Sequence, residues 1–137
     1  MKPRRSIHVE GFSHGNLPIP AASRVGNIIA TGGIPGISLS SGTFPPDAAT
    51  QTANAFALLT KILIAAGATP AEVVKVTVFV KDPVVREHVN REWLAMFPDP
   101  QSRPARHTLQ HDLAVPMLVQ LEALAVATGE DTASSDG

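Results

Sequence analysis

Apolar residues along this chain recur at spacings that predict two helices. Over residues 48–66 they follow helical spacing, with Asp47 placed as the N-cap and Gly67 as the terminator. A second apolar stripe begins near Val84 and stops at Pro98, where a proline ends the helix. The chain is therefore expected to contain two amphipathic helices, each with one buried face.

Other segments alternate in polarity or are rich in β-branched residues, which predicts strands. The clearest is the β-branched run over residues 73–80. Strands are also expected over 6–10, 25–31, 105–110 and 118–128, with a loop over 11–20 and turns over 32–36 and 113–116. This order of elements predicts an α+β domain of two layers, one sheet with both helices on one face.

The size of the chain and its apolar strands bear on domain organisation and assembly. A length of 137 residues suits a single domain, which we assign to residues 1–128. Residues 129–137 are expected to form a disordered tail. Several strands carry apolar residues on both sides of the pleat, so we expect subunit association to bury the sheet face without helices.

Composition and charge remove several classes of function. Apolar residues make up 44% of the chain and charged residues 17%, as in a folded globular protein. A formal net charge of −1 offers no general attraction for nucleic acid, so no nucleic-acid partner is expected. The absence of cysteine excludes disulfides, thiolate nucleophiles and cysteine-ligated zinc. Without a signal-peptide pattern or a run of ~20 apolar residues, a cytoplasmic protein with no membrane partner is expected.

Two charged residues on the last two predicted strands are the main candidates for chemistry. Strand alternation places Arg106 and Thr108 on one face, and Glu122 is a lone carboxylate in an apolar strand. A guanidinium on a strand can hold a small carboxylate by two parallel hydrogen bonds, and a nearby carboxylate can orient or deprotonate water. The two strands are expected to be antiparallel neighbours, so Arg106 and Glu122 could equally form a structural ion pair.

Histidines and glycines supply weaker candidates. His107 and His111 lie four residues apart in an expected strand and its end, about 13 Å by strand rise, too far to bind one metal ion together. No metal site is therefore expected. The glycine-rich turn over residues 32–36 lacks the lysine and the spacing of a phosphate-binding loop, so plain turn geometry explains it better.

Several motifs, in their order and spacing, resemble the RidA family, also called the YjgF or L-PSP family. The similarity extends over nearly the whole chain, to about Val126. It rests on Val25-Gly26-Asn27, Thr31-Gly32, Asp47 with Gln51-Thr52, Ala66-Gly67-Ala68, residues 73–82, Val89-Asn90, Pro104-Ala105-Arg106 and Leu121-Glu122-Ala123-Leu124-Ala125.

The resemblance implies a chorismate-mutase-like fold with a mixed sheet, assembled as a homotrimer with ligand pockets in the clefts between subunits. It also implies hydrolysis of 2-aminoacrylate or other 2-imino acids to 2-keto acids and ammonia, without metal or cofactor. Arg106 falls on the family's carboxylate-binding arginine, and Glu122 on the carboxylate that positions the attacking water. The family positions that line or support the pocket fall on Ile19, Thr31, Gly32, Asn90 and Thr108.

The chain also departs from the family's pattern, which leaves other functions open. Ile19 stands where a tyrosine is common, Gly33 where a glutamine is common, and His107 and Thr108 where a small residue and a cysteine are common. One alternative is deamination of a larger aminoenoate such as 2-aminomuconate. Another is a non-catalytic trimer that binds small carboxylates or acts as a regulator or chaperone. Endoribonuclease activity ranks last, because the sequence lacks a basic patch and an aromatic stacking surface.

Overall fold

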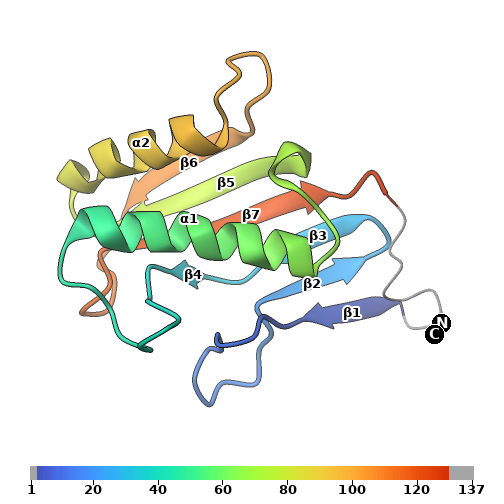
Figure 1. Ribbon diagram of the computed structural model, residues 1–137, viewed down its shortest axis with the longest axis horizontal. Helices are drawn as coiled ribbons and strands as arrows, with labels where there is room; N and C mark the ends of the chain where they lie inside the picture. Colours follow the sequence, from blue (N-terminus) through green and yellow to red (C-terminus); the bar gives the residue numbers. More distant parts are fainter. Residues whose placement is uncertain (1–2, 130–137) are drawn as a thin grey trace.

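A computed structural model describes residues 3–129, which form a sheet covered by two helices (Figure 1). The strands are β1 (Arg4–Ile7), β2 (Ala22–Val25), β3 (Ile28–Thr31), β4 (Ile34–Pro35), β5 (Val73–Val80), β6 (Ala105–Gln110) and β7 (Val119–Val126). The helices are α1 (Ala48–Ala65) and α2 (Arg86–Met96), with 3-10 turns at Pro70–Glu72 and Pro83–Val85. Both helices lie on one face of the sheet, which confirms the predicted two-layer α+β class.

The order of the strands corrects one expectation about the candidate site. The sheet runs β1-β2-β3-β7-β5-β6, and β4 pairs with β7. Strands β5 and β6 are parallel, because α2 connects them as a crossover, whereas the other paired strands are antiparallel. The sheet is therefore mixed. The prediction that the last two strands are antiparallel neighbours is wrong, since β5 lies between β6 and β7.

The N-terminal third differs most from the sequence-based expectation. The first strand covers Arg4–Ile7 rather than residues 6–10, because its register with β2 ends at Ile7 opposite Ala22. Strand β2 was not predicted, since the polar Arg24 interrupts the apolar pattern. Arg24 is nevertheless buried and donates a hydrogen bond to the carbonyl of Ala66 at 2.8 Å. Such a tertiary partner cannot be read from local polarity.

The glycine-rich turn over residues 32–36 contains a short strand as well as a turn. Ile34 and Pro35 form β4 opposite Leu121 and Gln120 of β7. Ile34 is fully buried, so backbone pairing and burial fix this segment. The segment thereby brings the glycines next to the strand that carries Glu122.

Helix α1 begins and ends where local sequence signals place it. Asp47 Oδ2 accepts hydrogen bonds from the Thr50 amide at 2.8 Å and from the Thr50 hydroxyl at 2.7 Å. The hydroxyl bond is the main reason that the pKa of Asp47 lies below its ordinary value. At the other end, Gly67 has a φ of 86°, a left-handed conformation that glycine adopts at low cost. The capping prediction is confirmed at both ends.

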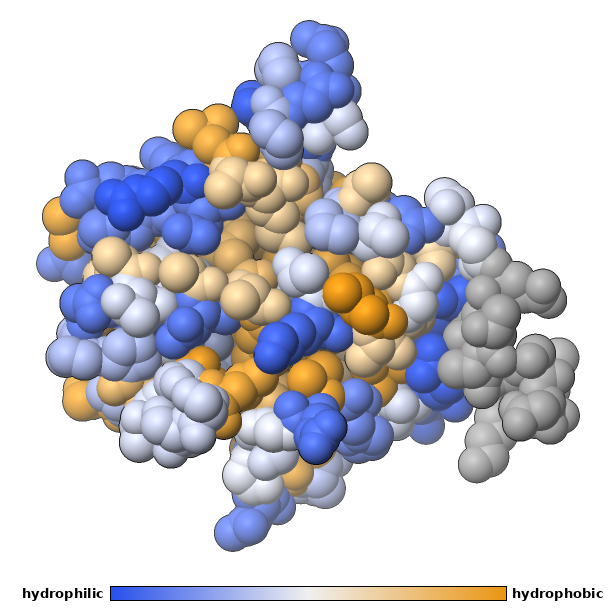
Figure 2. Space-filling view, viewed as in Figure 1, coloured by the Kyte–Doolittle hydropathy of each residue, from blue (hydrophilic) through white to orange (hydrophobic). Residues whose placement is uncertain are grey.

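The core lies between the helices and the sheet, and the opposite sheet face stays open. α1 contributes Leu59, Ile62 and Leu63, which are fully buried, while β5 contributes Val76 and Val78. Helix α2 contributes Val89 and Trp93. Over the helix-bearing face, hydrophilic and hydrophobic residues are interspersed (Figure 2). On the open face, apolar side chains of β3 and β7 remain partly exposed, among them Ile28, Leu124 and Val126.

Part of the predicted domain organisation concerns residues that the structure does not describe. The predicted terminal segment, residues 129–137, lies outside the described residues from position 130 onward. Within residues 3–129, neither helix is long and apolar enough to span a membrane.

Candidate functional site

Arg106 lies on the edge strand β6 and is held by two side chains of α2. Its Nη2 donates a hydrogen bond to Asn90 Oδ1 at 2.7 Å. Its guanidinium carbon lies 4.9 Å from the ring centroid of Trp93, within cation–π range. Trp93 is itself 9% exposed and packs edge-on against Phe97. Two side chains of α2, Asn90 and Trp93, therefore hold the guanidinium in place.

The charge of Arg106 is not neutralised by a carboxylate of the described residues. Partial burial is the main cause that lowers the pKa of Arg106, and the charge of Arg86 is the second. A guanidinium is so strong a base that the group stays charged at neutral pH. With one N–H occupied by Asn90, the remaining donors are available to an anion.

Thr108 follows Arg106 on the same side of β6 and has an unpaired hydroxyl. Its Oγ1 is buried and has no hydrogen-bond partner among the described residues. An unpaired buried polar group costs about 1–3 kcal/mol. The hydroxyl therefore remains able to donate or accept one further hydrogen bond.

Glu122 lies on the opposite face of the sheet. In the register, Arg106 pairs with Val76, whereas Glu122 pairs with the next residue of β5, Thr77. Because successive side chains of a strand point to opposite faces, Arg106 faces the helices and Glu122 faces the open side. Within one protomer the two groups cannot form the ion pair that the sequence left open.

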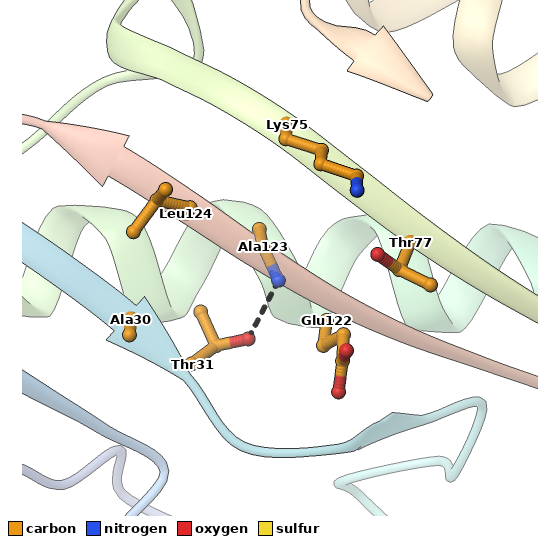
Figure 3. A pocket seen from close by; sticks show the side chains of 7 residues that line it. All are labelled: Ala30, Thr31, Lys75, Thr77, Glu122, Ala123 and Leu124. Atoms are coloured by element: carbon orange, nitrogen blue, oxygen red, sulfur yellow. Dashed lines mark hydrogen bonds between the residues drawn. The ribbon is translucent and has the colours of Figure 1, made fainter. Parts of the chain in front are cut away.

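Glu122 and Thr31 share a shallow hollow on the open face (Figure 3). The hollow has a volume of about 240 Å³ and is lined by Ala30, Thr31, Lys75, Thr77, Glu122, Ala123 and Leu124. Thr31 Oγ1 accepts a hydrogen bond from the Ala123 amide at 2.9 Å and donates to the Gly32 carbonyl at 2.8 Å. Thr31 therefore joins β3 to β7 beside Glu122.

Glu122 also borders a second hollow, whose lining combines polar and apolar side chains. This hollow measures about 320 Å³ and is lined by Phe79, His111, Asp112, Leu113, Ala114, Met117, Gln120 and Glu122. Lys81 Nζ donates to Asp112 Oδ1 at 2.7 Å, and this bond lowers the pKa of Asp112. Glu122 thus stands between two open depressions rather than inside a closed pocket.

Gly32 is hydrogen-bonded to the segment before β2, and Ile19 lies apart from both hollows. The Gly32 amide donates to the Ala21 carbonyl at 2.9 Å, and His14 Nε2 lies 2.9 Å from the Gly33 carbonyl oxygen. The loop before β2 is thereby fixed against the glycines. Ile19, in that loop, is 49% exposed and is not among the residues that line either hollow.

The seven candidate residues therefore fall into three groups rather than one site. Arg106, Asn90 and Thr108 lie on the helix side of the sheet edge, Thr31 and Glu122 on the open face. Gly32 and Ile19 belong to the turn after β3 and to the loop before β2. Among the described residues, no group of three or more histidine and acidic side chains is placed to hold a metal ion.

Sequence reasoning missed two residues of α2. Trp93 was not among the candidate residues, yet its ring supports the Arg106 guanidinium. Arg86 was not singled out, although its charge acts on Arg106. Helical spacing offered a signal, because Arg86, Asn90 and Trp93 lie at i, i+4 and i+7 and so share a face.

Residues 18–127 match the sequence model of the family described as Endoribonuclease L-PSP. The chain belongs to this family. A RutC family protein of Haemophilus influenzae is 31% identical over 123 residues, which cover 88% of this chain and 95% of that protein. This membership confirms the resemblance drawn from the sequence motifs.

Solved structures similar to this L-PSP-family chain confirm its fold. The YjgF gene product of Escherichia coli is 30% identical with a TM-score of 0.80, covering 89% of this chain and 98% of that one. A protein of Thermotoga maritima described as a putative endoribonuclease is 29% identical with a TM-score of 0.83, covering 94% and 100%. The two helices over a mixed sheet are thus the chorismate-mutase-like arrangement of YjgF.

This L-PSP-family chain has Gly33 where a glutamine is common, and the side chain of Gln120 lies next to that glycine. A Cβ placed at Gly33 would collide with the Nε2 atom of Gln120. The Gln120 amide therefore occupies the space that a side chain at position 33 would need. Gln120 and Glu122, both on β7, line the same hollow.

Proposed function

We propose that this L-PSP-family protein hydrolyses reactive 2-aminoacrylate or other 2-imino acids to 2-keto acids and ammonia. The observation that carries the proposal is the Arg106 guanidinium, which Asn90 and Trp93 hold in place without a neutralising carboxylate. A fixed, partly buried guanidinium with spare donors is suited to a small carboxylate. Neither a metal nor an organic cofactor takes part in the proposed reaction.

The proposed chemistry assigns one step to each charged group. Arg106 binds the carboxylate of the imine by two hydrogen bonds, and Thr108 offers its unpaired hydroxyl beside it. 2-Aminoacrylate, an enamine, first becomes 2-iminopropanoate by loss of a proton from nitrogen and gain of one at C3. Glu122 then orients and deprotonates a water molecule, whose oxygen adds to the C2 carbon of the C=N bond while the proton passes to nitrogen. The hydroxyl proton of this tetrahedral intermediate also moves to nitrogen, the C–N bond breaks, and ammonia leaves as the C2 carbonyl of the 2-keto acid forms. One imine and one water give one keto acid and one ammonia.

Arg106 and Glu122 lie on opposite faces of the sheet, which supports a site built between subunits. A substrate held by Arg106 of one protomer can meet Glu122 only if Glu122 comes from another protomer. Exposed apolar residues on the open face, among them Leu124 and Val126, support burial of this face by a second copy. We therefore propose a homotrimer, the number of subunits that the family resemblance implies, with its sites in the clefts.

The test is keto-acid release from 2-aminoacrylate that a dehydratase generates in situ. Wild type should accelerate release above the spontaneous rate. Arg106→Ala should lose about 100-fold or more, because two charge-assisted hydrogen bonds disappear. Arg91→Ala, which removes an equal charge from an exposed position of α2, is the matched control and should retain the rate.

The outcomes separate the proposal from its alternatives. No acceleration by wild type of 2-aminoacrylate or of larger imines would overturn the enzymatic proposal and favour a carboxylate-binding role. An Arg106→Ala protein that is unfolded would instead indicate a structural role for Arg106. Glu122→Gln tests the water-positioning step separately, since it removes the base while keeping the size of the side chain.

A further inference from the structure

A second arginine stands one helical turn from the residue that holds Arg106. Arg86 is the first residue of α2, and Asn90, which accepts the hydrogen bond of Arg106, lies four residues later. Side chains at this spacing lie on one face of a helix, with Cβ atoms about 5–6 Å apart. Burial is the main cause that lowers the pKa of Arg106, and the charge of Arg86 lowers it further.

Thr108 completes this cluster from the strand. Helix α2 runs antiparallel to β6, so its first residue lies toward the end of the strand at which β6 finishes (Figure 1). Thr108 follows Arg106 in that direction, and its hydroxyl is buried without a partner among the described residues. Two guanidinium groups and an unsatisfied hydroxyl therefore gather along the edge of α2 and β6.

The cluster lacks a counter-charge within the described part of the chain. No ion pair of Arg86 or Arg106 with a carboxylate is found there, and Glu87, next to Arg86, lies 3.7 Å from His88 Nε2. Arg86 and Arg106 carry like charges, which repel each other. An anion that contacts both guanidiniums would relieve this repulsion, and a dianion would neutralise both.

We propose that Arg86 binds a second anionic group of the ligand, so that this site prefers small dicarboxylates with a 2-imino or 2-keto group. The assignment of the first carboxylate to Arg106 rests on the proposed function. A four- or five-carbon dicarboxylate carries an anionic group at each end of a short chain, which suits two neighbouring guanidiniums. Arg86 thereby selects the substrate, and Arg106 holds the end that reacts.

Equilibrium binding tests this proposal without requiring turnover. Calorimetry would compare 2-oxoglutarate with 2-oxopentanoate, which has the same five-carbon chain but lacks the terminal carboxylate. Wild type should bind 2-oxoglutarate roughly tenfold more tightly, and the difference should shrink at high salt because the pair is partly exposed. Arg86→Ala should remove this preference. Arg91→Ala, which makes the same change of charge on the same helix, should keep it.

Two results would overturn the second carboxylate site. One is equal affinity of wild type for the two keto acids. The other is an equal loss of preference in Arg91→Ala and Arg86→Ala, which would indicate a general effect of net charge.

Turnover separates this proposal from the deaminase proposal. The imines of glutamate and norvaline, supplied in situ by an amino-acid oxidase, differ by the same terminal carboxylate. Preferential binding of 2-oxoglutarate without hydrolysis of either imine would support the Arg86 site and overturn the deaminase function. Hydrolysis of both imines with equal kcat/KM, together with equal binding of both keto acids, would support the deaminase function and overturn the Arg86 site.

Discussion

At the scale of single residues, the structure distinguishes the groups that hold Arg106 from those that a ligand would use. Asn90 and Trp93 already contact the guanidinium, so they position it. Thr108 has no partner for its hydroxyl among the described residues. Since an unpaired buried hydroxyl destabilises a fold, we propose that Thr108 serves binding rather than folding.

Thr108→Val tests this distinction between binding and folding. Valine keeps the branched shape and removes the hydroxyl, so the free energy of unfolding should stay equal or rise by up to about 1 kcal/mol. Affinity for keto acids should fall several-fold, because the ligand loses one hydrogen bond. Urea denaturation measures the first quantity and calorimetry the second. A clear loss of stability with unchanged affinity would contradict the proposed role of Thr108.

At the scale of elements, a single acidic residue joins the start of β5 to the end of β7. Glu72 Oε1 accepts a hydrogen bond from the Thr69 amide at 2.9 Å, in the 3-10 turn that precedes β5. Its other carboxylate oxygen accepts from the Thr128 hydroxyl at 2.6 Å and from the Thr128 amide. These bonds lower the pKa of Glu72 from 4.5 to about 2, and the bond from the Thr128 hydroxyl contributes most.

The lowered pKa of Glu72 predicts a pH-dependent contribution to stability. A carboxylate with a lower pKa in the folded state stabilises the fold fully above its unfolded pKa of 4.5, and this gain is lost as the pH falls toward 2. Wild type should therefore exceed Glu72→Gln in free energy of unfolding near pH 7, and the difference should shrink steadily below pH 4.5. Urea denaturation across this range measures it.

Thr128→Val provides the control for this effect, because it removes the hydroxyl that contributes most to the lowered pKa. In that background the pH dependence of the Glu72 contribution should be smaller. A wild-type advantage that stays constant from pH 7 to pH 2 would contradict the linkage.

At the scale of the whole molecule, the two charged groups of the proposed reaction face opposite sides of one sheet. β5 separates β6 from β7, and the register sets Arg106 and Glu122 one residue out of phase. If the site lies between subunits, each site takes Arg106 from one protomer and Glu122 from another. Activity then depends on how protomers are combined.

Mixed oligomers of two inactive variants test this arrangement. Arg106→Ala and Glu122→Gln protomers, coexpressed with different tags, should form oligomers in which some sites combine both intact side chains. In a closed ring of three protomers, every mixed oligomer has one of its three sites restored, so about a third of the sites should be active. Imine hydrolysis by the doubly purified oligomers measures the recovery. Absence of recovery in mixed oligomers would contradict a site shared between subunits.

The sequence by itself determined those elements whose signals are local. The cap at Asp47, the left-handed Gly67 and the β-branched run of β5 predicted their elements within a residue or two. Helix α2 began later than expected, because Pro83–Val85 first forms a 3-10 turn. Periodicity also indicated the candidate residues Arg106 and Glu122, since alternation along a strand is a property of the chain itself.

Only the tertiary structure decided how these elements and residues combine. Strand order depends on which strand a crossover brings alongside β5, and no local pattern encodes that choice, so the separation of Arg106 from Glu122 could not be predicted. The same holds for β2 and β4, whose short segments are strands because of their partners. The support of Arg106 by Trp93 likewise arises from packing of α2 on β6. These features depend on contacts between distant parts of the chain, which sequence periodicity does not specify.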